Sequence, residues 1–148
     1  MTNSAIPAYA GEIGVADAYA ALQATDKSAL VDVRTEAEWL YVGTPDLSAL
    51  EKKPILLEWQ AYPDMAIVPA FVERLADLLH RRGLDQDAPI YFLCRSGVRS
   101  RAAAIAATQA GWKKCYNVTE GFEGPRDQAG HRGRERGWKA AGLPWSQT

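Results

Sequence analysis

One short polar segment, residues 94–100, combines a cysteine with a backbone suited to binding an anion. It reads Cys-Arg-Ser-Gly-Val-Arg-Ser. An apolar run typical of a buried strand, 89–93, precedes it, and an alanine-rich run that favours a helix, 101–110, follows it. Successive backbone N–H groups in such a turn form an anion-binding nest, and the helix N-terminus adds partial positive charge. The segment therefore predicts an activated Cys94 thiolate that faces a small anion.

The strand and helix around Cys94 belong to a longer alternation of apolar runs and helical periodicities. The apolar runs predict strands over 29–33, 54–57, 89–93 and 114–118. The helical periodicities predict helices over 15–25, 35–40, 69–82 and 101–110. Loop is expected over 60–68, and one short helix is expected near 133–141. Strands that alternate with helices indicate an α/β fold, with a mainly parallel sheet covered on both faces.

Several polar or aromatic side chains directly follow the predicted strands. Ligands of open parallel sheets bind beyond the carboxyl ends of the strands. Arg34, Trp59, Cys94 and Glu120 each come just after one of these strands. We therefore expect them to lie along one edge of the sheet, around the cysteine segment, with Trp59 as a wall of the pocket.

Composition and charge exclude several classes of protein. A chain of 148 residues suits one domain, and a net charge of -1 gives no global attraction to nucleic acid or to a membrane surface. No run approaches the length of a membrane span, and the N-terminus lacks a secretory pattern, so cytoplasmic localisation is expected. Two cysteines and two widely spaced histidines are too few for a zinc site, so no metal is expected.

Two stretches of the sequence resemble the signature motifs of rhodanese domains. The first is Leu30 to Thr35 followed by Glu38-Trp39. The second runs from Cys94 to Ser100, through Ala103-Ala104 and Gly111-Trp112, to Tyr116-Asn117-Val118 and Glu120-Gly121-Phe122. The resemblance covers about residues 12–123 and implies a three-layer α/β/α fold with a central, mainly parallel sheet of about five strands. We expect a single domain over 1–148, in which 124–148 form a C-terminal extension packed on the core.

The resemblance also implies a sulfurtransferase. In rhodaneses a cysteine thiolate attacks the outer sulfur of a donor such as thiosulfate, and the resulting persulfide passes sulfur to cyanide or a thiol. Cys94 matches the nucleophile. The loop around the persulfide and the donor matches Arg95, Ser96, Gly97, Val98, Arg99 and Ser100. Thiolate attack needs no metal or organic cofactor. The implied partners are a small anionic sulfur donor and a thiol or cyanide acceptor, with a protein acceptor as a further possibility.

Other reactive side chains have structural interpretations. Asp32 is costly in an apolar strand unless it is paired, so we expect an ion pair with Arg34 or a loop arginine that braces the site. Glu38, three positions after Thr35, is expected to complete a capping box, and Cys115 is expected to pack in the core. A basic run in the extension is either a solvated face or a segment folded over the active edge that recruits anions. Its members are His131, Arg132, Arg134, Arg136 and Lys139.

Two rival functions share the cysteine loop. Cysteine phosphatases and arsenate reductases also bind tetrahedral oxyanions in such a nest, but phosphatases place five residues between cysteine and arginine. Here four residues separate Cys94 from Arg99, which makes a tighter loop suited to a single sulfur atom. The second rival is a non-catalytic or slow sulfur carrier or regulatory domain that serves a protein partner.

Overall fold

The structure is a computed structural model that describes residues 8–147. Within this range there are four α-helices: α1 (Val15–Ala24), α2 (Glu36–Val42), α3 (Phe71–Arg81) and α4 (Val98–Gln109). The main strands are β1 (Gly11–Ile13), β2 (Ala29–Asp32), β4 (Ile55–Leu56), β7 (Pro89–Leu93) and β8 (Lys114–Val118). Two-residue strands form two small pairs: β3 (Thr44–Pro45) with β9 (Trp145–Ser146), and β5 (Gln60–Ala61) with β6 (Ala66–Ile67).

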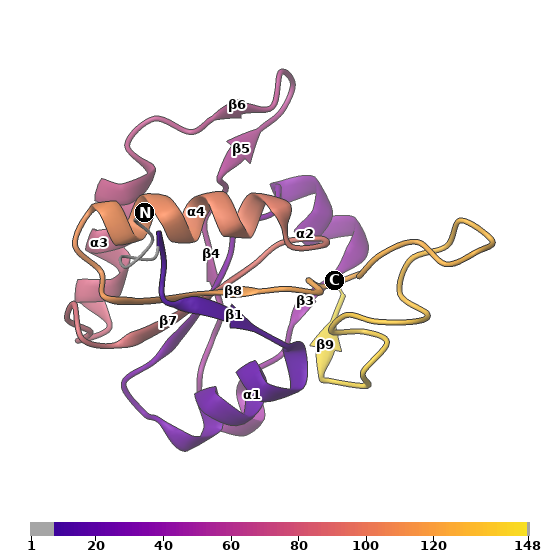
Figure 1. Ribbon diagram of the computed structural model, residues 1–148, viewed down its shortest axis with the longest axis horizontal. Helices are drawn as coiled ribbons and strands as arrows, with labels where there is room; N and C mark the ends of the chain where they lie inside the picture. The colour runs from indigo at the N-terminus through magenta and orange to yellow at the C-terminus, as the bar shows by residue number, and fades with distance from the viewer. Residues whose placement is uncertain (1–7, 148) are drawn as a thin grey trace, which may run out of the picture.

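The five main strands form one sheet in the order β1-β8-β7-β2-β4, and every neighbouring pair is parallel. The predicted parallel α/β fold is therefore confirmed. Figure 1 shows α3 and α4 on one side of this sheet and α1 on the other. The carboxyl ends of the strands point toward α2 and the C-terminal segment.

Alternate residues of the central strands supply two separate apolar cores. Val31, Ile90 and Phe92 pack with the buried side chains of α3 and α4 on one face. Leu30 and Leu93 pack with α1 on the other face. Because successive side chains of a strand point to opposite faces, this alternation places Cys94 in the α3/α4 core.

The C-terminal segment, residues 124–147, packs on the α1 face. Trp138 is fully buried in that core, and its indole N–H donates to the Pro144 carbonyl. Lys139 Nζ lies 3.9 Å from the ring centre of Trp145 and donates to the Val42 carbonyl. The antiparallel β3–β9 pair then joins the end of the segment to the residues that follow α2.

Three local expectations differ from the structure, and one strand was not predicted. Residues 60–68, expected to be loop, hold the β5–β6 hairpin, and the helix expected near 133–141 is a series of turns and bends. Glycines at 130, 133, 137 and 142 all have positive φ, which breaks any helix there. Helix α4 begins at Val98 rather than 101, because the cysteine loop itself winds into its first turn. The edge strand β1 is too short to give a periodic signal.

No helix within residues 8–147 is both long enough and apolar enough to cross a bilayer.

Candidate active site

Cys94 follows the last residue of β7 and is 1% exposed. Its Sγ accepts a hydrogen bond from the Gly97 N–H at 3.1 Å and lies 3.2 Å from Ser100 Oγ. Gly97 has a φ of 107°, and a Cβ at this position would overlap the Thr119 carbonyl. The tight, left-handed turn therefore requires glycine, and it aims one backbone N–H at the sulfur, whereas the predicted nest has several.

A chain of hydrogen bonds continues from Cys94 through the interior to the edge strand β1. The Ser100 hydroxyl donates to Asn117 Oδ1, and Asn117 Nδ2 donates to Glu12 Oε2 at 2.9 Å and to the Gly97 carbonyl at 3.1 Å. Ser100 and Asn117 are both fully buried. Because its two donors are occupied, the Asn117 amide has a fixed orientation that presents its oxygen to Ser100. The hydrogen bonds of Asn117 in β8 and Glu12 in β1 thus fix the position of the loop.

Two members of this chain, Asn117 and Glu12, had no role predicted from the sequence. Glu12 lies in the three-residue strand that gave no signal, and its carboxylate also binds Arg101 at 3.0 Å. Asn117 offered one clue, because it is a polar side chain in a short strand beside the cysteine strand. Burial alone would raise the pKa of Glu12, but hydrogen bonds from Tyr9, Asn117 and Arg101 outweigh it and lower that pKa.

Arg99, at the closing position of the loop, forms a two-pronged ion pair with Glu38. Its Nη1 and Nη2 donate to the two carboxylate oxygens at 2.7 and 2.9 Å. Glu38 also forms the predicted capping box with Thr35 at the start of α2. Burial alone would raise the pKa of Glu38, but the hydrogen bonds and charge of Arg99, with those of Thr35, hold it at about 2. Glu38 is therefore a partner of the loop as well as a cap.

The Glu38 pair should make stability depend on pH. The folded pKa of about 2 lies below the ordinary 4.5, so the carboxylate stabilises the fold above about pH 4.5 and loses this effect as the pH falls toward 2. We expect Glu38→Gln to lower the free energy of unfolding by about 1 kcal/mol near neutral pH, because the pair is partly exposed. The difference from wild type should shrink in urea unfolding at about pH 3. A difference that does not change with pH would contradict this role. Glu36→Gln, at an exposed position of the same helix turn, is the control.

Asp32 and Arg34 form the buried ion pair expected from the sequence. Arg34 Nη2 lies 2.6 Å from Asp32 Oδ2, its Nε donates to Oδ1 at 2.9 Å, and both side chains are 0% exposed. The guanidinium also stacks 4.2 Å from the centre of the Phe122 ring and donates to the Gly43 carbonyl. The pair therefore joins β2 to the turn after β8 and to the end of α2, below the loop rather than in the open pocket.

An open cavity of about 600 Å³ lies over Cys94. The loop contributes Cys94, Arg95, Ser96, Val98 and Arg99 to its lining, whereas Gly97 and Ser100 are not part of it. The other lining residues come from α2, the β5–β6 hairpin and the segment after β8: Glu38, Val42, Gln60, Tyr62, Met65, Glu123 and Arg132. The hairpin residues were missed because 60–68 carries turn residues and no clear periodicity. Arg132 places one part of the basic run over the active edge.

Besides Arg34, two further expected neighbours lie outside this lining. The Trp59 ring packs edge-on against Phe71 at a centroid distance of 4.9 Å, at the border of the α3/α4 core, and does not wall the cavity. Glu120 lines a different hollow beside the start of α1. Both follow strands that end level with β7, since Leu56 pairs with Asp32, Asp32 with Leu93, and Asn117 with Phe92. A place after a strand end therefore does not by itself bring a side chain into the cavity over Cys94.

Cys115 has the structural role expected for it. It is fully buried in the α3/α4 core, and burial raises the pKa of its thiol to about 11. A thiol that resists ionisation is a poor nucleophile. Within residues 8–147, no group of three or more histidine, cysteine or acidic side chains is placed to hold a metal ion.

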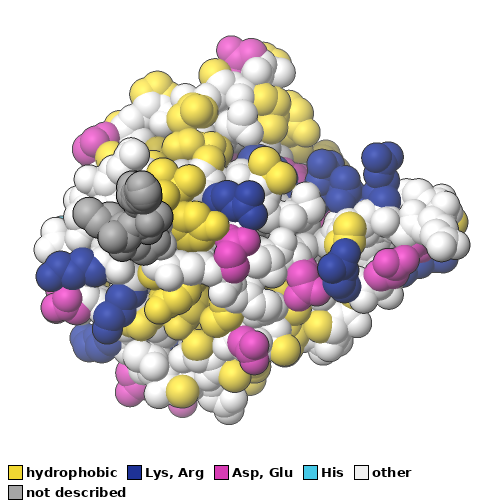
Figure 2. Space-filling view, in the orientation of Figure 1, with side chains coloured by type: hydrophobic (Ala, Val, Ile, Leu, Met, Phe, Trp, Pro, Cys, Tyr) yellow, Lys and Arg dark blue, Asp and Glu magenta, His cyan; other side chains and the backbone are white. Residues whose placement is uncertain are grey.

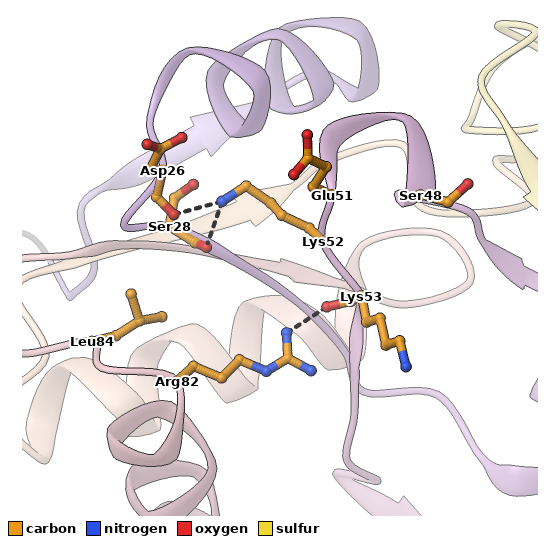
Figure 3. A pocket seen from close by; sticks show the side chains of 8 residues that line it. All are labelled: Asp26, Ser28, Ser48, Glu51, Lys52, Lys53, Arg82 and Leu84. Carbon is orange, nitrogen blue, oxygen red and sulfur yellow. Dashed lines mark hydrogen bonds between the residues drawn. The ribbon is translucent and has the colours of Figure 1, made fainter.

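A second cavity, of about 610 Å³, lies at the amino ends of the strands, away from Cys94. Figure 3 shows two of its cations turned toward backbone carbonyls: Lys52 Nζ donates to the carbonyls of Asp26 and Ser28, and Arg82 donates to that of Lys53. These contacts tie together the loops that precede β2, β4 and β7. Lys52 and Arg82 therefore have a structural role in this cavity.

Comparisons with known proteins agree with this fold. The model of the STR4 middle domain matches residues 10–148. An uncharacterised protein of Rickettsia conorii is 41% identical over 128 residues, which cover 86% of this chain and 90% of that protein. The chloroplastic rhodanese-like domain-containing protein 4 of Arabidopsis thaliana is 26% identical over 129 residues, which cover 87% of this chain and 24% of that protein.

Two solved structures are similar. The crystal structure of Rv0390 from M. tuberculosis has a TM-score of 0.84 and 46% identity, covering 95% of this chain and 99% of that one. The polysulfide-sulfur transferase homodimer of Wolinella succinogenes has a TM-score of 0.56 at 23% identity, covering 95% and 80%, and so supports the fold alone. The parallel sheet, the cysteine loop at its carboxyl edge and these matches identify the chain as a member of the STR4 middle domain family with a rhodanese-like fold.

Proposed function

We propose that this protein is a sulfurtransferase that carries sulfane sulfur as a persulfide on Cys94. The observation that carries the proposal is the position of Cys94 Sγ. It lies at the floor of an open cavity, with the Gly97 N–H directed at it and Ser100 beside it. A thiolate and a terminal persulfide sulfur are both anions, and a preformed N–H donor stabilises either one.

The chemistry is two displacements at sulfur. The Cys94 thiolate attacks the outer sulfur of thiosulfate, the S–S bond of thiosulfate breaks, and sulfite leaves with the bonding electron pair. An acceptor such as cyanide or a thiolate then attacks the outer sulfur of the persulfide. This step forms thiocyanate or a new persulfide and returns the Cys94 thiolate. The electrons balance at each step, so neither an oxidant nor a metal takes part.

The surroundings of Arg99 argue against a phosphatase. A phosphoenzyme needs the arginine of the loop to bind two oxygens of the phosphoryl group. Here both terminal nitrogens of Arg99 are bound to Glu38, whose own negative charge lines the same cavity. Arg99 is therefore not free to bind a phosphoryl group in this way. The charge of Glu38 would repel a thiosulfate dianion as well as a phosphate dianion, so the preference for a sulfur donor rests on the four-residue spacing and on the engaged arginine.

Turnover with thiosulfate and cyanide tests the proposal. We expect the protein to release thiocyanate, and a sample treated with thiosulfate alone to gain the mass of one sulfur atom on Cys94. Cys115→Ser should behave as wild type, because Cys115 is buried away from the cavity. Absence of both thiocyanate and the added sulfur would overturn the proposal. Hydrolysis of an aryl phosphate that depends on Cys94 would favour the phosphatase instead.

A further inference from the structure

Arg95, from the cysteine loop, and Arg132, from the C-terminal segment, line the cavity over Cys94. Arg126, also in the C-terminal segment, lies outside this lining, and its positive charge acts on Arg132. Arg132 is held in place by a hydrogen bond to the Gly124 carbonyl at 2.7 Å. Burial, then the positive charges of Arg95 and Arg126, lower the pKa of Arg132. Within residues 8–147, none of the three forms an ion pair with a carboxylate.

This cluster concentrates positive charge on a chain whose net charge is -1. Glu123 is the one acidic residue of the lining that is not bound to an arginine, so cations outnumber free carboxylates there. Figure 2 shows Lys and Arg side chains gathered at the upper right, between the hairpin and the C-terminal segment. Like charges held together by the fold repel one another unless an anion lies among them.

Apolar side chains border the same cavity on the other side. Val98, in the cysteine loop, is 75% exposed, and Tyr62, in the hairpin, is 61% exposed. Met65 completes the apolar side. Large apolar groups exposed together beside a cluster of charges are typical of a surface that binds a protein. Thiosulfate has no hydrocarbon part that could cover these side chains. Binding of this donor therefore does not explain why they are exposed beside the cavity.

We infer that this rim, formed by Tyr62, Met65, Arg95, Val98, Arg126 and Arg132, docks an acidic segment of a protein that carries the acceptor thiol. The inference rests on the proposed function and names the acceptor. The acidic residues of the partner would lie on the arginines, its apolar residues would cover Val98 and Tyr62, and its cysteine would enter the cavity. Its thiolate attacks the outer sulfur of the persulfide, the bond from that sulfur to Cys94 Sγ breaks, and the Cys94 thiolate leaves with the electron pair.

Single-turnover transfer to synthetic peptides tests the docking surface. The protein is loaded with sulfur from thiosulfate, freed of excess donor, and mixed with a peptide whose one cysteine lies among acidic residues and leucines. A second peptide has lysine in place of each acidic residue. We expect the acidic peptide to take sulfur about tenfold faster at low ionic strength, and added salt to reduce this ratio. Replacing the leucines of the acidic peptide by serine should also slow transfer to that peptide.

Matched variants separate docking from chemistry. Arg126→Gln combined with Arg132→Gln should remove most of the preference for the acidic peptide. Arg134→Gln, an exposed neighbour outside the cavity lining, should keep it. The rate of discharge by cyanide, measured for each protein, serves as the reference. The ratio of the rate with the acidic peptide to this reference should fall in the double variant and stay unchanged in Arg134→Gln. Equal rates for the two peptides, with normal discharge by cyanide, would overturn this inference alone. Failure to form any persulfide would instead overturn the proposed function.

Discussion

Replacing Cys94 by serine should reduce thiocyanate formation by about 10³-fold or more. Serine cannot carry sulfane sulfur, because the step requires a thiolate that forms an S–S bond and later leaves as a thiolate. The exchange of one sulfur for oxygen barely changes the volume, and the Gly97 N–H and Ser100 Oγ can still contact the side chain. The loss should therefore appear in kcat and in persulfide formation by mass spectrometry, without a loss of fold.

The control for this variant is Cys115→Ser, assayed together with thermal unfolding of both proteins. It should retain turnover even if it loses some stability, because a hydroxyl replaces a buried thiol in the α3/α4 core. The interpretation of the site would be wrong if Cys94→Ser kept its activity. It would also be wrong if only the Cys115 variant lost activity while remaining folded.

The second large effect is expected at the buried pair below the loop. Asp32→Ala should lower the free energy of unfolding by about 3–5 kcal/mol, because it leaves the Arg34 guanidinium buried without its counter-ion. Within the described residues, Arg34 Nη1 already has no hydrogen-bond partner, so the lost carboxylate cannot be replaced easily. Denaturant unfolding monitored by tryptophan fluorescence would measure the change.

Two further variants show whether the cost comes from burial. Asp77→Ala breaks an ion pair with Arg81 whose side chains are 59% and 73% exposed, and it should cost less than about 1 kcal/mol. Replacing Asp32 and Arg34 together by Leu and Met should recover much of the loss, since no charge is then left buried. A single Asp32→Ala variant as stable as the Asp77 variant would show that water reaches Arg34.

The sequence predicted the parts of the fold that depend on local pattern. The buried strands at 29–33 and 89–93 are continuous apolar runs, and the capping box at Thr35 and Glu38 is a fixed spacing, so each is readable without the rest of the chain. For a residue whose role depends on a partner elsewhere in the fold, the sequence predicted the kind of partner but did not identify it. Asp32 was predicted to need a cation, and Arg34 supplies it.

The remainder of the candidate site depends on tertiary contacts that leave no periodic signal. The pairing of Arg99 with Glu38 joins the start of α4 to the start of α2, and nothing in either helix specifies the other. The hairpin that lines the cavity is two residues per strand, which is too short to show alternation. Arg132 was predicted only as one member of a basic run. The turns of the C-terminal segment bring Arg132 into the cavity lining and leave Arg134 outside it, and this difference leaves no pattern in the sequence.

The place of β1 at the outer edge of the sheet has a consequence for folding. Its partner is β8, so Asn117 meets Glu12 across 105 residues of chain, and Arg101 meets it across 89. Contacts with such long sequence separation close large loops and are slow to form. During synthesis from the N-terminus, Glu12 emerges early but must wait for Asn117. A growing chain therefore contains Cys94 before Asn117 and Glu12 can form their hydrogen bond in its surroundings.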